Sequence, residues 1–141
     1  MILYLDASAL VKLYVEEPGS AAVATQVERA EAVMTVRVTY AEARAALARL
    51  RREGGLTAPA LRRAVRQLDD EWVTYDVVNV SDPVVRRAGA LAERHALRGH
   101  DAVQLAAALD VRDAGTDLEF ACFDDRLARA ASRERLPLAA S

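Results

Sequence analysis

Short apolar runs alternate with longer segments of helical periodicity, and this alternation restricts the fold of the chain more than any other feature. Ile2–Leu5 is an apolar run too short for a core helix, so it is expected to form a buried strand. Similar runs predict strands at 32–36, 77–80 and 118–123. Because helical segments separate these runs, the sequence predicts an α/β fold with a mostly parallel sheet covered on both faces.

Residues that favour helix starts and stops divide the remaining segments. Ser20 has the position of a helix cap, and Thr39 with Glu42 has the spacing of a capping box. Pro59 stands in the first turn of another helix. The expected helices cover 7–15, 20–30, 39–53, 58–72, 84–96, 101–111 and 124–132, with a loop at 97–100 and a candidate edge strand at 136–138.

Length and composition favour one small domain in a reducing compartment. The chain has 141 residues, 52% of them apolar, so residues 1–141 are expected to form a single domain with its own core. Cys122 is the only cysteine, which excludes an internal disulfide and suits the cytoplasm.

With neither a basic leader nor an apolar run of membrane-spanning length, no membrane association is expected. The formal net charge of −2 argues against bulk attraction to nucleic acid.

Three acidic residues are expected at one edge of the sheet. Asp6 and Asp124 directly follow expected strands, and Glu42 follows the second strand by a few residues. In a parallel sheet the ends of the strands and the starts of the following helices share one edge, where open α/β folds bind ligands. Asp101 does not follow a strand, and simple alternation places the start of its helix at the opposite edge.

Each of these acids also has a purely structural interpretation. Asp6, Asp101 and Asp124 stand where helices are expected to begin, and an Asp there caps free amides. Glu42 fits the capping box. If the four converge, each pair repels by roughly 4 kcal/mol at about 4 Å and an effective dielectric near 20, so a cation has to neutralise them. Carboxylate oxygens favour Mg²⁺ or Mn²⁺, and the two histidines do not have zinc-site spacing.

Four short motifs, each containing one of these acids, make the chain resemble the PIN-domain family, and within it the VapC-type toxins of bacterial and archaeal toxin–antitoxin pairs. The motifs are Leu5–Leu10, Thr39–Glu42, His100–Ala106 and Phe123–Leu127. Any one of them is a weak signal, but all four in this order and at these separations are a strong one. Together they span essentially the whole chain.

The resemblance implies a three-layer α/β/α sandwich, Mg²⁺-dependent endoribonuclease activity and a cognate VapB-like antitoxin. It assigns the catalytic and metal-binding positions to Asp6, Glu42, Asp101 and Asp124, and thereby brings Asp101 to the other acids. Ser8 matches a small hydroxyl residue near the metal, for which substrate contact and capping of the first helix are equally good interpretations. The antitoxin is expected to occupy the acidic groove with Arg or Lys.

One position departs from the pattern of the family. Cys122 stands where the family often has Ser or Thr, and a thiol replaces a hydroxyl in size but donates only weakly. The motif spacing selects Asp124 rather than Asp125 as the fourth acid, and Asp125 is interpreted as a solvated first-turn residue.

The expected mechanism is hydrolysis of RNA by metal-activated water, with Asp6 and Asp101 as the most direct ligands. No suitably placed His pair supports attack by the 2′-hydroxyl, so products with 5′-phosphate and 3′-hydroxyl ends are predicted. The arginines between 44 and 66 are interpreted as a solvated surface in preference to a guide for RNA. Surplus apolar positions from Leu47 to Leu68 suggest a homodimer.

Two other functions fit part of the pattern. A non-catalytic module could receive a basic peptide in the acidic groove. A phosphatase could use Asp6 as nucleophile, although enzymes of the haloacid-dehalogenase type have a second Asp where Ser8 stands.

Overall fold

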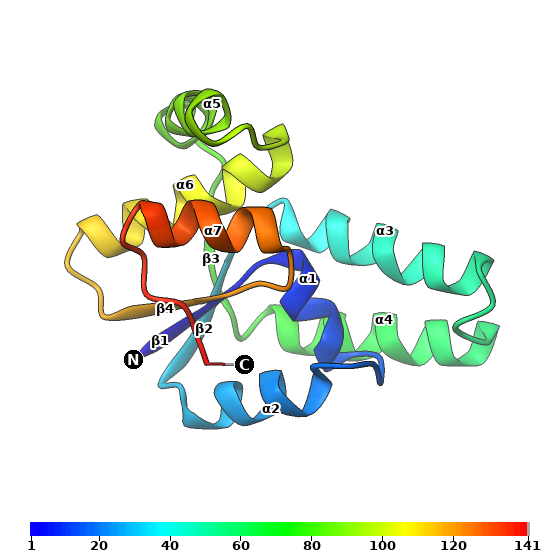
Figure 1. Ribbon diagram of the computed structural model, residues 1–141. Helices are drawn as coiled ribbons and strands as arrows, with labels where there is room; N and C mark the ends of the chain where they lie inside the picture. Colours follow the sequence, from blue (N-terminus) through cyan, green and yellow to red (C-terminus); the bar gives the residue numbers. More distant parts are fainter. Residues whose placement is uncertain (141) are drawn as a thin grey trace.

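A four-stranded sheet lies between layers of helices in the computed structural model, which describes residues 1–140 (Figure 1). The strands are β1 (Ile2–Leu5), β2 (Ala32–Val36), β3 (Asp76–Val78) and β4 (Leu118–Ala121). They lie in the order β3-β2-β1-β4, and all three pairings are parallel. The predicted α/β class with a parallel sheet is therefore confirmed.

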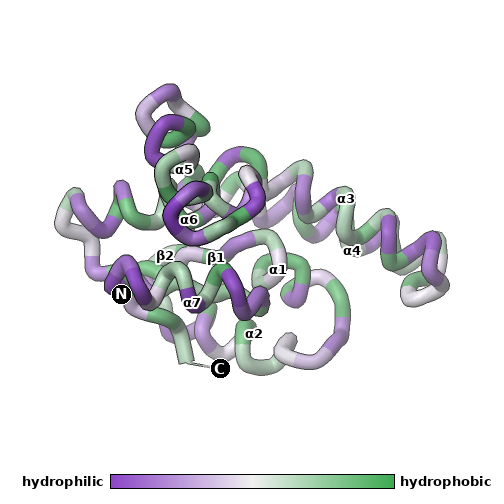
Figure 2. The backbone as a smooth tube through the Cα atoms, turned by 45° about the horizontal axis from the view of Figure 1, so that its top comes forward, coloured by the Kyte–Doolittle hydropathy of each residue, from purple (hydrophilic) through white to green (hydrophobic). Residues whose placement is uncertain are grey.

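Helices cover both faces of this sheet. They are α1 (Ala7–Leu10), the 3₁₀ helix η1 (Val11–Leu13), α2 (Ser20–Arg29), α3 (Thr39–Arg52), α4 (Ala58–Trp72), α5 (Asp82–His95), α6 (Gly99–Asp113) and α7 (Asp125–Arg133). Hydropathy alternates along α3 and α4, as expected for helices with one buried side (Figure 2). Among residues 1–140, no helix has the length and apolarity needed to span a bilayer.

The alternation of side chains along β1 separates two cores. Tyr4 belongs to the core under α5, α6 and α7, where its ring stacks on Phe120 with a centroid distance of 5.4 Å. Leu3 and Leu5 point to the other face, into a core shared with α1, α2, α3 and α4. Because both faces of β1 are fully buried, its carboxyl end has a fixed position, and Asp6 follows it directly.

Two predicted helix caps are wrong. Gly19, with a φ of 97°, caps α2, and Ser20 Oγ instead donates to the Val15 carbonyl and accepts from the Glu17 amide. No side chain caps α3, whose N-cap is Val38. The Thr39 and Glu42 side chains make tertiary contacts in place of a capping box.

Strand ends also differ from the prediction. The third strand stops at Val78. The fourth stops at Ala121, because the backbone turns away after it and the Phe123 amide donates to Ser8 Oγ. The candidate edge strand is reduced to a single parallel bridge between Leu138 and Phe120.

The α5–α6 pair explains how Asp101 reaches the sheet edge that holds Asp6. Helix α5 packs chiefly against α6 and is seen nearly end-on in Figure 1, whereas α6 runs across the view. Since α5 does not cross the sheet, α6 starts at the carboxyl ends of the strands and finishes near the start of β4. The predicted loop at 97–100 is shorter in the structure, because α6 already begins at Gly99.

Candidate active site

Asp6 is the most buried acid of the site. It lies at the end of β1, is 4% exposed, and caps α1. Its Oδ1 accepts hydrogen bonds from Ser8 Oγ (2.7 Å) and from the Ala9 amide (2.9 Å). These two bonds fix the carboxylate, and the other oxygen, Oδ2, makes no hydrogen bond to any group in residues 1–140.

Glu42 and Asp101 lie beside Asp6 and share a histidine. His100 Nδ1 is 3.3 Å from Glu42 Oε2 and 3.4 Å from Asp101 Oδ1. Arg98 Nε lies 3.6 Å from the other oxygen of Asp101. The first turns of α3 and α6 therefore bring these two acids together with Asp6, as the family motifs implied.

The environment disfavours the charged form of two of these acids. Burial raises the pKa of Asp6 to about 7; the charges of Asp101 and Glu42 add to this, against the hydrogen bonds from Ser8 and Ala9. Burial also raises the pKa of Glu42, although Gln104 and His100 act in the opposite direction. When neighbouring carboxyl groups resist ionisation, a cation between them favours their charged forms.

A buried polar chain that the sequence did not reveal holds Glu42. Gln104 is 1% exposed; its Oε1 accepts from the Tyr4 hydroxyl (2.9 Å), and its Nε2 donates to Thr39 Oγ1 (2.8 Å) and Glu42 Oε1 (3.1 Å). Thr39 in turn is bonded to the Thr35 hydroxyl (2.8 Å).

The directions of these bonds follow from their last acceptor. The Leu5 carbonyl, 2.7 Å from Thr35 Oγ1, can only accept, so the single hydrogen of Thr35 points to it and Thr39 donates to Thr35. Thr39 then accepts from Gln104, whose amide orientation is set by the Glu42 carboxylate that accepts from Nε2. The only sequence signal for Gln104 was a polar residue in an otherwise apolar segment of α6.

Asp124 joins the group more loosely. It caps α7 by accepting from the Leu127 amide (2.8 Å), and it lines a hollow of about 510 Å³ together with Asp101. The structure thus places Asp6, Glu42 and Asp101 near enough for their charges to act on one another, and Asp124 at the hollow that Asp101 also lines.

Ser8 does not cap the first helix, and Cys122 makes a weak hydrogen bond from the position where the family often has a hydroxyl. Ser8 Oγ donates to Asp6 and accepts from the Phe123 amide (2.9 Å), so it ties the end of β1 to the loop after β4, and Asp6 caps α1 instead. Burial, with the charge of Asp6, raises the pKa of the Cys122 thiol to about 12. Its Sγ lies 3.7 Å from the Asp124 carbonyl.

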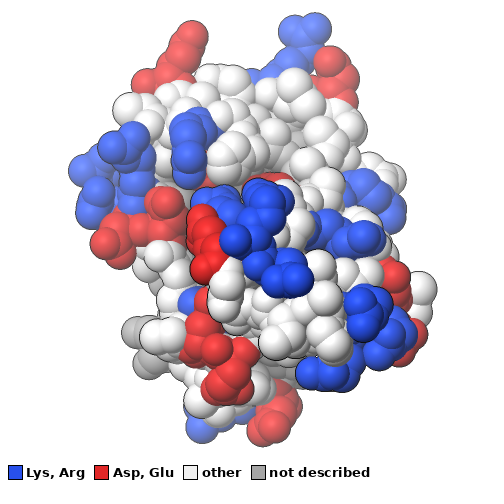
Figure 3. All heavy atoms as spheres, turned by 90° about the vertical axis from the view of Figure 1, so that its right-hand side faces the viewer, with Lys and Arg blue, Asp and Glu red and all other residues white. Residues whose placement is uncertain are grey.

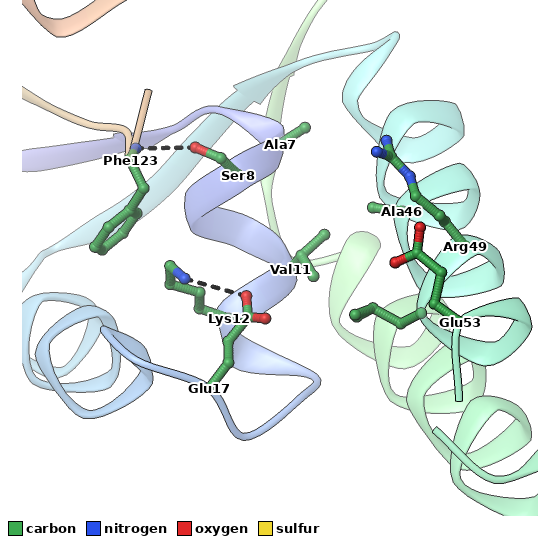
Figure 4. A pocket seen from close by; sticks show the side chains of 10 residues that line it. Ala7, Ser8, Val11, Lys12, Glu17, Ala46, Arg49, Glu53 and Phe123 are labelled. Atoms are coloured by element: carbon green, nitrogen blue, oxygen red, sulfur yellow. Dashed lines mark hydrogen bonds and ion pairs between the residues drawn. The ribbon is translucent and has the colours of Figure 1, made fainter. Parts of the chain in front are cut away.

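A separate cavity of about 290 Å³ lies between η1 and α3 (Figure 4). Val11 faces Ala46 and Arg49 across it, while Lys12 extends toward Phe123 at the other end. Lys12 Nζ is paired with Glu17 at 3.1 Å. The lining of this cavity is more apolar than that of the hollow at Asp101 and Asp124.

The donor set matches a hard divalent cation in chemistry, although the side chains are not assembled around one. Carboxylate oxygens from β1, α3 and α6 are the ligands that Mg²⁺ and Mn²⁺ prefer. Within residues 1–140, no three His, Cys, Asp or Glu side chains already stand in position to hold one ion. Glu42 Oε2 and Asp101 Oδ1 face His100, while Glu42 Oε1 is held by Gln104.

Comparisons with known proteins identify relatives of the chain. The PIN domain model matches residues 3–133. The chain is 43% identical over 126 residues to Ribonuclease VapC49 of Mycobacterium tuberculosis, covering 89% of this chain and 86% of that protein.

Solved structures show the same fold at low identity. FitAcB from Neisseria gonorrhoeae has a TM-score of 0.71 and 19% identity, with 99% of this chain and 97% of that chain covered. A toxin-antitoxin complex from Klebsiella pneumoniae has a TM-score of 0.60 and 18% identity, with 86% of each chain covered.

Proposed function

Because the chain belongs to the PIN-domain family and, within it, to the VapC-type ribonucleases, we propose that it is a toxin that cleaves RNA phosphodiesters in an Mg²⁺-dependent reaction. The observation that carries the proposal is Asp6, a buried carboxylate at the end of β1 whose pKa is raised by burial and by the charges of Asp101 and Glu42. Mn²⁺ is the expected substitute ion.

In this proposal Asp6 and Asp101 hold the ion most directly, and Glu42 and Asp124 hold a second ion or its waters. An ion held by these carboxylates would lower the pKa of a bound water and would offset negative charge on the phosphate. Ser8 and the Ala9 amide keep Asp6 oriented, and Gln104 does the same for Glu42. Ser8 is also the candidate contact to substrate.

The histidines favour water as the nucleophile. His95 Nε2 is bonded to Glu134 at 2.6 Å, which leaves only His100 beside the acids. No His pair is therefore placed to serve as base and acid in an attack by the RNA 2′-hydroxyl, and we expect products with 5′-phosphate and 3′-hydroxyl ends.

The test is cleavage of total cellular RNA by purified wild type and Asp6→Asn, with mapping of both ends of each product. Wild type is expected to cut with Mg²⁺ or Mn²⁺ and to stop when the metal is chelated. Asp6→Asn should lower the rate by more than about 100-fold, since even outer partners of metal ligands are worth 10–100-fold. Products with 2′,3′-cyclic phosphate, or metal-independent cleavage, would contradict the mechanism.

The partner that we propose is a VapB-like antitoxin that covers the acidic rim with Arg or Lys. Such groups satisfy carboxylates through charge-assisted hydrogen bonds. The cavity between η1 and α3 lies beside Ser8, and it offers an apolar surface to the antitoxin segment that covers the acidic rim. Purified toxin that cleaves RNA equally well with and without the co-expressed antitoxin would contradict this.

A further inference from the structure

The hollow of about 510 Å³ between the starts of α6 and α7 is lined by charged side chains only. Its lining residues are Arg98, Asp101, Asp124, Asp125, Arg126 and Arg129. Two of them, Asp101 and Asp124, belong to the proposed active site. The other carboxylate and the three guanidinium groups have no role in the mechanism given above.

The guanidinium groups of this hollow are poorly neutralised by the protein itself. Arg98 pairs with Asp101 at 3.6 Å, but its side chain is 72% exposed, and such pairs contribute little. Within the part of the chain that the structure describes, Arg126 Nη1 donates only to the Ala96 carbonyl, at 3.4 Å. Arg129 makes no ion pair with any group in residues 1–140.

The spacing along α7 places these arginines in one row. Arg126, Arg129 and Arg133 are three and four residues apart, which puts them on the same face, and all three are exposed. The opposite face, with Leu127 and Ala130, is buried. Because Asp124 caps this helix, the row begins at the acids and leads away from them.

We propose that Arg126 and Arg129 bind backbone phosphates of single-stranded RNA next to the bond that is cut. This inference rests on the proposed ribonuclease function. A polyanion that approaches Asp101 and Asp124 is repelled, and cations in the same hollow offset that repulsion. Guanidinium groups bind phosphate oxygens in pairs of hydrogen bonds, which position a strand without reading its sequence.

The arginines near the ends of α3 and α4 provide the natural control. Basic side chains gather on the face toward which these helices project, with acidic side chains among them (Figure 3). Arg51 and Arg52 are exposed there but do not line the hollow that contains Asp101 and Asp124. Changing them removes the same charge at a different place.

The test measures binding of a short fluorescent single-stranded RNA by anisotropy, in an Asp6→Asn background that prevents cleavage. Arg126→Gln/Arg129→Gln is compared with Arg51→Gln/Arg52→Gln between about 50 and 200 mM salt. The first pair should weaken binding roughly ten-fold and reduce the slope of log affinity against log salt by about 1.4, or 0.7 for each lost phosphate contact. The control pair should leave the slope nearly unchanged.

Kinetics on the active protein give a second readout. Arg126→Gln/Arg129→Gln should raise KM with little change in kcat, because the lost contacts are made in the ground state and the transition state alike. Equal melting temperatures of the variants and their parents establish that folding is unaffected, as expected for exposed side chains.

Four results would overturn the inference in different ways. If both pairs weaken binding equally, bulk charge and not this hollow attracts the RNA. If Arg126→Gln/Arg129→Gln weakens the binding of a poly-glutamate peptide as much as the binding of RNA, the hollow is a general anion site. If wild type cleaves RNA and Arg126→Gln/Arg129→Gln changes neither KM nor the salt slope, the ribonuclease function is supported and the proposed phosphate site is wrong. If wild type neither cleaves nor binds RNA, both proposals fall.

Discussion

At the residue scale, the four acids could be identified from motif spacing, but the side chains that orient them could not. Thr39 and Glu42 have the spacing of a capping box, yet the structure uses both in tertiary contacts with Gln104. A capping box is a local pattern, whereas this polar chain joins β1, β2, α3 and α6. Such a contact depends on packing between distant segments, which local periodicity does not encode.

Gln104→Met tests whether this amide orients Glu42. Methionine keeps the volume but leaves Glu42 Oε1 and the Tyr4 hydroxyl without their partner, so the affinity for Mn²⁺ should fall roughly 10–100-fold. Calorimetric titration with Mn²⁺ measures this.

Tyr4→Phe is the matched control for Gln104→Met. It removes the donor to Gln104 Oε1 in the same core but leaves both amide hydrogens in place. We expect it to lower the melting temperature with little effect on Mn²⁺ affinity. Equal losses of affinity in both variants would show general damage to the core.

Asp6→Asn should stabilise the metal-free protein at neutral and higher pH. The pKa of Asp6 is raised from 3.8 to about 7, so between these values the unfolded chain loses a proton that the folded chain retains, and stability falls as pH rises. The variant should gain on the order of 2–4 kcal/mol above pH 7 and nothing below the ordinary Asp pKa. Asparagine keeps a carbonyl oxygen for Ser8 and Ala9.

Thermal melts in a chelator, run across the pH range, measure this difference. A variant that is less stable than wild type at every pH would show that the Asp6 carboxylate is not strained in the folded state.

At the element scale, sheet class and most helix positions could be predicted, because they follow from periodicity. The path from β3 to α6 could not. Simple alternation placed the start of α6 at the wrong edge, and only the packing of α5 on α6 corrects it. The family resemblance supplied the convergence of Asp101 that periodicity did not provide.

Gly19 is an element boundary where the side chain has to be absent. Its φ of 97° is left-handed, and a Cβ there would lie 2.7 Å from Phe123 Cε1. At Gly54 the φ is 84°, but a Cβ meets no atom within 4 Å. Gly54→Ala should therefore cost about 1–2 kcal/mol from backbone strain alone.

Gly19→Ala should cost more than Gly54→Ala, because the ring of Phe123 also has to move. Denaturant unfolding of both variants measures the difference. Equal losses would mean that Phe123 yields freely and that α2 does not depend on the contact.

At the scale of the whole molecule, the expected homodimer stays a prediction, and one reason for it has gone. Leu47 and Leu68, within the segment that suggested surplus apolar surface, are fully buried in the chain's own core. The large apolar side chains that remain exposed include Val73, Val80 and Val85, near the ends of α4 and β3 and on α5.

Divalent metal should stabilise the whole fold by binding only its native state. The gain is about 2.7 kcal/mol when the ion is at 100 times its dissociation constant. The melting temperature should rise with Mg²⁺ or Mn²⁺, fall back when EDTA is added, and respond much less in Asp6→Asn. A wild-type melting temperature that is indifferent to both ions would remove the basis of the metal site.

The first residue and the end of the described chain lie together, away from the acids. Met1 and Ala140 line the same hollow beside α2, whereas Asp6 stands at the opposite end of β1. An affinity tag, a surface anchor or a fusion partner attached at either end thus leaves the acidic rim clear. A circular permutant that joins these two positions by a short linker, and opens the chain elsewhere, is a feasible scaffold for engineering.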